Sequence, residues 1–102
     1  MNYSDLIASI EAEWEVDTSF LWKAREGQFD PAAFDRTYKK LQGLSIDEAA
    51  DIPRRLVSLL WYMPLFLSWQ TDRVREKGGD VDAYTRAAVS ITNEIERLLG
   101  VP

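Results

Sequence analysis

The chain has 102 residues, no cysteine, no histidine and a formal net charge of -5 at pH 7. The two missing residue types exclude disulfides, thiol nucleophiles, the usual Cys/His zinc sites and histidine-dependent catalysis. The acidic balance disfavours nucleic acid as a partner, because phosphates would be repelled. A chain of this length typically forms one domain, so we expect residues 1–102 to fold as a single unit.

Apolar residues recur at spacings of three and four, and no alternating strand pattern is present, which predicts an all-α protein. The first helix is expected to begin at Ser4, as its N-cap, and to end near Gly27. The polar triplet at residues 17–19 marks a bend or a restart within it. A second helix follows Asp30-Pro31, a cap with proline at the first helical position, and stops at Gly43.

The second half of the chain predicts two or three more helices. Residues 45–48, SIDE, fit the capping box and indicate a helix start that Pro53 limits to about two turns. A long central helix follows over about residues 53–77. Asp80 then caps a final helix that ends at Gly100. We therefore expect a compact four- to five-helix bundle around a largely buried central helix.

The most unusual segment is the apolar run from Leu56 to Trp69, LVSLLWYMPLFLSW. Its fourteen residues would reach about 21 Å as a helix, whereas a membrane core needs about 30 Å. Arginines close the run on both sides, and the N-terminus lacks the basic region of a secretory signal. We therefore expect no membrane span and a cytoplasmic location.

Pro64 lies near the middle of the apolar run. A proline inside a helix leaves the carbonyl four residues earlier, that of Leu60, without its partner, at a cost of about 3 kcal/mol. We therefore expect a kink or a break there, with the Ser68 hydroxyl turned back toward the Pro64 carbonyl.

Helical spacing divides the apolar run into faces. One side carries residues suited to the core, namely Leu56, Leu60, Met63 and Leu67. The neighbouring lines carry Trp61, Tyr62, Leu65 and Trp69. Core packing is the leading interpretation of most of these residues. Because tryptophan and tyrosine anchor interfaces, the second set is also a possible dimer face or partner face.

The most specific surface feature is the acidic segment EAEWEVD at residues 11–17, in which acids stand at alternate positions: Glu11, Glu13, Glu15 and Asp17. On a helix these acids would form two like-charge pairs four residues apart, which are mildly destabilising. A solubilising surface explains the segment most simply. The sharper interpretation is a docking patch for a basic protein, with Trp14 or Trp22 filling a pocket of the partner.

One sequence pattern is also found in the metal sites of enzymes. Glu48-Ala49-Ala50-Asp51 has the E-x-x-D spacing with which all-α nucleotide pyrophosphatases hold magnesium, but the E-x-x-E partner motif is missing. We therefore assign no catalytic, metal or cofactor site, and we expect a protein that is not an enzyme.

These observations lead to three expectations, in order. The first is a small acidic protein-binding module, concretely a bacterial immunity or antitoxin-type protein that neutralises a basic toxin by occlusion. The second is a homodimeric structural or regulatory protein that pairs through the aromatic face of the central helix. The third is a metal-dependent all-α nucleotide hydrolase.

Overall fold

The computed structural model describes residues 2–102, and within that range every regular element is a helix. In chain order the elements are α1 (Tyr3–Glu11), the 3-10 turn η1 (Ala12–Trp14), α2 (Phe20–Arg25), α3 (Pro31–Gln42), α4 (Arg54–Trp69), α5 (Thr71–Glu76) and α6 (Val81–Leu99). The predicted all-α helical bundle is confirmed. None of the helices described is long and apolar enough to cross a membrane.

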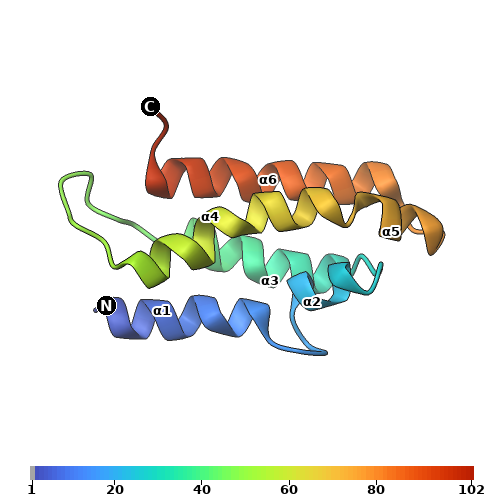
Figure 1. The fold of residues 1–102 in the computed structure, drawn as a ribbon, viewed down its shortest axis with the longest axis horizontal. Coiled ribbons are helices and arrows are strands. Elements are labelled where there is room, and N and C mark those ends of the chain that lie inside the picture. Colours follow the sequence, from blue (N-terminus) through green and yellow to red (C-terminus); the bar gives the residue numbers. More distant parts are fainter. Residues whose placement is uncertain (1) are drawn as a thin grey trace.

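The helices form an elongated bundle of 43 × 28 × 20 Å. Helix α4 packs against α6 on one side and α1 on the other, while α3 also packs on α6 (Figure 1). The two ends of the described chain lie at the same end of the bundle (Figure 1). Helix α4 therefore lies between α1 and α6 and contacts both of them.

Four helices begin at a side chain that accepts a hydrogen bond from the first turn. The caps are Asn2 for α1, Ser19 for α2, Asp30 for α3 and Asp80 for α6. The predicted caps at Asp30 and Asp80 are confirmed. The predicted cap at Ser4 is wrong, because the Asn2 side chain accepts from the backbone of Asp5 and starts α1 earlier.

The first predicted helix is divided in two, at the restart that the sequence indicated. Helix α1 ends at Glu11, and after η1 the backbone becomes extended at Glu15, with φ -64° and ψ 141°. Asp17 then adopts a left-handed conformation at φ 70° within the turn at residues 16–18, before Ser19 caps α2. The acids at residues 11–17 therefore do not share one helix, and the predicted helical like-charge pairs do not form.

The helix predicted to start at residues 45–48 is also absent, because residues 44–53 form an irregular connection. The Asp47 carboxylate accepts from the backbone N–H of Ala49 at 2.9 Å, which closes a turn in place of a helix. Arg97 of α6 holds the start of the connection by donating to the carbonyl of Leu44. Pro53 limits a helix here to two turns at most, and the turn at Asp47 occupies the residues that would begin it.

The predicted central helix is divided at Gln70, not at Pro64. Helix α4 continues through Pro64 to Trp69. At its end the Leu67 carbonyl accepts both the backbone N–H of Gln70, at 3.2 Å, and the buried hydroxyl of Tyr84, at 2.6 Å. A continuing helix would use that carbonyl for the next turn, so these two bonds explain the break between α4 and α5.

The hydrogen bond that we expected from Ser68 near Pro64 goes to another carbonyl. The Ser68 hydroxyl donates to the carbonyl of Leu65 at 2.7 Å instead of the carbonyl of Pro64. The serine thus bonds back by three residues, as is usual near a helix C-terminus where the last turn tightens.

The core confirms the faces that spacing predicted for α4. Its inner side is fully buried and consists of Leu56, Leu60, Met63 and Leu67. Residues from every other α-helix complete one continuous core around this side. The outer side of α4 is exposed, so the central helix is buried along one side only.

Candidate protein-binding site

The outer side of α4 carries a ridge of three large apolar residues, spaced four residues apart. Trp61 is 49% exposed, Leu65 36% and Trp69 58%. Two tryptophans exposed to this extent on one helix are unusual, because their large rings are mostly covered in folded proteins. The ridge is therefore the first feature of the surface that suggests a binding site.

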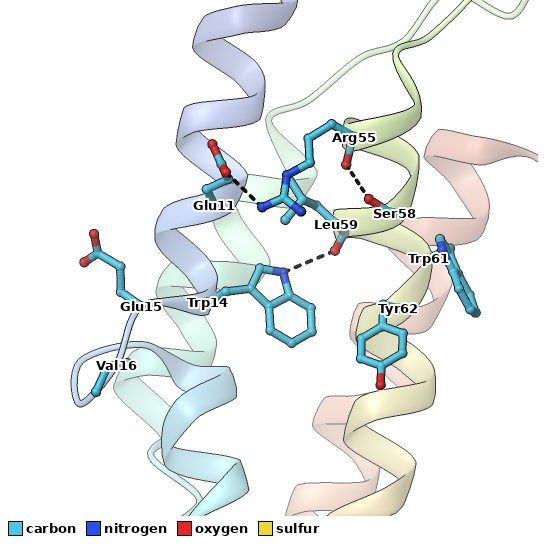
Figure 2. Close-up of a pocket in the computed structure, with 9 residues that line it drawn as sticks. All are labelled: Glu11, Trp14, Glu15, Val16, Arg55, Ser58, Leu59, Trp61 and Tyr62. Atoms are coloured by element: carbon cyan, nitrogen blue, oxygen red, sulfur yellow. Dashed lines mark hydrogen bonds and ion pairs between the residues drawn. The ribbon is translucent and has the colours of Figure 1, made fainter.

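Beside the ridge, Tyr62 and Phe66 lie half-buried and pack on Trp14 of η1. The rings of Trp14 and Phe66 meet edge to face, with centroids 5.2 Å apart. The indole N–H of Trp14 donates to the Leu59 carbonyl at 3.3 Å (Figure 2). These contacts fix Trp14 against α4, so it contributes a wall to the surface and does not project as a free anchor.

Two open pockets lie between this ridge and the segment from η1 to α2. The first has a volume of about 640 Å³, and its walls include Glu11, Glu15, Val16, Arg55, Ser58 and Trp61 (Figure 2). The second has a volume of about 560 Å³, and its walls include Leu21, Trp22, Arg25, Phe66, Trp69 and Gln70. Trp14, Val16 and Tyr62 line both pockets and so join them into one surface.

All four tryptophans of the chain meet on this surface. We call it the tryptophan face and define it by Trp14, Trp22, Trp61 and Trp69 with Tyr62 and Phe66. The sequence predicted two separate surfaces, one with Trp14 and Trp22 and one with Trp61 and Trp69. The structure brings them together, because Trp14 of η1 packs on α4 and α2 also contacts α4.

The four acids of the predicted docking patch divide into two groups. Glu11 pairs with Arg55 at 2.9 Å at the edge of the first pocket. Glu13 points toward α3, where its carboxylate pairs with Lys40 at 2.6 Å and accepts from the buried Thr37 hydroxyl. Its side chain is only 12% exposed. Glu13 therefore holds η1 on α3, and its carboxylate is engaged within the chain.

Glu15 and Asp17 form the second group. Both are exposed, and within residues 2–102 neither takes part in an ion pair. Glu15 lines the first pocket and Asp17 follows Val16, which is 59% exposed. These carboxylates are available to a cation of another molecule.

The opposite end of the tryptophan face is basic. The guanidinium of Arg25 lies 5.3 Å from the centre of the Trp22 ring, at the edge of the second pocket. Arg73 of α5 is exposed beside it and donates to the Arg25 carbonyl at 2.9 Å. The face thus has an acidic end at Glu15 and a basic end at Arg25. The sequence did not single out Val16, Arg25 or Gln70, because only the folded chain places them here.

The two groups with shifted acidities lie outside the tryptophan face. The hydrogen bond from Lys23, followed by that from the Ala33 backbone, lowers the pKa of the Asp30 carboxyl. Burial raises the pKa of the Tyr84 hydroxyl. Asp30 caps a helix and Tyr84 bonds to a core carbonyl, so both groups serve the fold.

The residues considered for metal binding do not form a site. Glu48 and Asp51 lie in the irregular connection and are exposed, so no helix holds their carboxylates on one face. Within residues 2–102, no group of three or more acidic side chains is placed to hold a metal ion.

Comparison with known proteins adds no assignment, since no family model, curated protein or solved structure matches this chain.

Proposed function

We propose that the chain is a protein-binding module and that its tryptophan face binds a basic partner protein. The observation that supports this function is the meeting of all four tryptophans on one surface with two open pockets. Tryptophan and tyrosine dominate the binding energy of protein interfaces, because they bury a large area at little cost in conformational entropy. A fold selected for stability alone would have no reason to keep Trp61 and Trp69 in water.

Charge supports a basic partner. The chain carries a net charge of -5, so it attracts cationic surfaces at long range. Glu15 and Asp17, which hold no ion pair within residues 2–102, then supply carboxylates next to the first pocket. The exposed pair of Glu11 with Arg55 contributes little stability and can exchange partners at low cost.

The concrete form that we propose is an immunity or antitoxin-type protein. Such a protein acts by occlusion: it covers the basic surface with which a toxin binds its target. Here the carboxylates would pair with the cations of the toxin, while apolar side chains of the toxin would enter the two pockets between the ridge and η1.

The product of the adjacent gene is the first partner to test, with binding measured by titration calorimetry. We expect Trp61→Ser to weaken binding by about tenfold to a hundredfold, as truncation of an interface tryptophan does. The matched control is Val89→Ser, which removes an exposed apolar residue of α6 outside both pockets and should leave the affinity unchanged. A partner bound equally well by both variants would refute the proposed face.

Charge reversal gives a second, independent measurement. Glu15→Lys should weaken binding and reduce its dependence on salt, because one attractive contact becomes repulsive. Asp82→Lys makes the same change in charge at an exposed position in the first turn of α6. If the two variants have equal effects, only the net charge matters and the acidic end of the face has no specific role.

A further inference from the structure

We propose that, in the isolated chain, the tryptophan face pairs with the same face of a second copy, with the two α4 helices antiparallel. The face is suited to this because its apolar ridge is exposed and its two ends carry opposite charges. The ridge of Trp61, Leu65 and Trp69 projects beside the two pockets, and each pocket has one of the two ridge tryptophans in its wall.

The spacing of the ridge defines where this axis passes. Trp61 and Trp69 are eight residues apart, about 12 Å along the helix, and Leu65 lies midway between them. An axis through Leu65, perpendicular to α4, brings Leu65 against its own copy. It also places Trp61 beside Trp69 of the second copy. The first pocket of each copy then lies opposite the second pocket of the other copy.

The charges select the antiparallel arrangement. Glu15 marks one end of the face and Arg25 the other. In an antiparallel pair the acidic end of each copy meets the basic end of the other, and symmetry repeats this contact twice. A parallel pair would place like charges together, which is unfavourable.

The area available suits a reversible dimer. A stable interface buries at least about 1,200 Å² in total. A tryptophan side chain offers roughly 200 Å², so two half-exposed tryptophans on each copy supply roughly 400 Å² of this total. Val16, Leu65 and the pocket walls must supply the rest. Because about two-thirds of the threshold is left to these partly covered residues, the interface lies at or below the small end of the range, where association is weak enough to be reversed.

This inference rests on the proposed function at one point only: the second copy and the basic partner would use the same face, so they exclude one another. Self-association would then set how much of the tryptophan face is free to bind. Adding the basic partner should convert dimers of the chain into one-to-one complexes.

The test is analytical ultracentrifugation of the full chain, without any partner, from about 1 µM to about 1 mM. We expect a reversible monomer–dimer equilibrium within that range. Leu65→Asp places two carboxylates at the axis and should weaken association at least tenfold, and so should Trp61→Ser. Val89→Asp, on exposed α6 surface outside the pockets, is the matched control and should leave the dimer intact.

A charge exchange tests the antiparallel geometry. Glu15→Arg alone and Arg25→Glu alone should each weaken the dimer, whereas the double variant should restore it, because the attraction is re-established with signs reversed. Additive losses in the double variant would overturn the antiparallel arrangement. Circular dichroism and melting of each variant verify that it remains folded.

Two outcomes separate this inference from the proposed function. A chain that stays monomeric over the whole range, yet binds a basic partner through Trp61, overturns the dimer and supports the function. A dimer that Leu65→Asp and Trp61→Ser leave unchanged also overturns the inference, since it must form through another surface. A dimer that the ridge variants dissociate, in a chain whose partner binding ignores Trp61, supports the dimer and refutes the function.

Discussion

Replacing Tyr84 with phenylalanine removes one hydroxyl from the centre of the bundle. The side chain is fully buried, and its hydroxyl donates to the Leu67 carbonyl at 2.6 Å, where α4 ends. The ring should remain in place, since it packs edge to face on Phe29. A neutral buried hydrogen bond contributes about 1 kcal/mol net, so Tyr84→Phe should lower the free energy of unfolding by about 1 to 1.5 kcal/mol at pH 7.

The same substitution should remove a dependence on alkaline pH. Burial raises the pKa of the Tyr84 hydroxyl above its ordinary value of 10.0, so the folded state favours the neutral form. The stability that this provides is complete well below pH 10 and is lost as the pH rises toward the folded pKa. Wild-type stability should therefore fall by about 1.4 kcal/mol between about pH 9 and about pH 11, and the two proteins should become equally stable near the upper value.

Urea unfolding, followed by circular dichroism at pH 7 and then at intervals from about pH 9 to about pH 11, measures both effects. Tyr38→Phe is the control, because that ring is half-buried and stacked on Phe34. It should keep the alkaline loss of stability. If wild type and Tyr84→Phe lose stability in parallel above pH 10, burial of this hydroxyl does not govern the alkaline behaviour and the reasoning is refuted.

Substitutions at Asp30 and Gly27, each with a matched control, test two helix ends. Asp30→Ala removes the cap of α3 and should cost about 1 to 2 kcal/mol in chemical unfolding, whereas Asp30→Asn keeps a cap and should cost less. Lys23 lowers the pKa of Asp30 below 3.8, so the wild-type advantage should disappear as the pH falls below that value. Gly27→Ala should cost at least about 2 kcal/mol, because φ is +80° and the new Cβ would lie 2.8 Å from the Arg73 carbonyl. Gly78→Ala has φ +77° and no neighbour within 4 Å, so it should cost only about 1 kcal/mol, and equal losses would contradict the close approach of α2 to α5.

The parts of the fold that could be predicted depend on neighbouring residues in the chain. The starts of α3 and α6 follow from Asp30 and Asp80, because a cap needs only the next two or three residues. The inner side of α4 follows from spacing alone. The end of α4 could not be predicted, since the break depends on the hydroxyl of Tyr84, which reaches Leu67 from another helix.

The candidate site divides in the same way. Spacing placed Trp61, Leu65 and Trp69 on one line, and all three are exposed. The tryptophan face also contains Trp14 and Trp22, which precede and follow the turn at Asp17. The left-handed conformation of Asp17 could not be predicted from the sequence. The predicted helix start at residues 45–48 was wrong for a local reason. A capping box indicates a helix start only where the following residues can continue the helix.

The acidic segment shows why composition alone could not separate acids that hold the fold from acids that face solvent. Glu13 and Lys40 are far apart in sequence, and only the fold brings the carboxylate onto the ammonium and onto the Thr37 hydroxyl. Removing Glu13 would therefore leave Lys40 without its partner and loosen η1, which holds Trp14 against α4. A loss of binding in a Glu13 variant would then reflect a displaced tryptophan face and not a lost contact with the partner. Only Glu15 and Asp17, which are exposed and hold no ion pair within residues 2–102, can report on charge recognition directly.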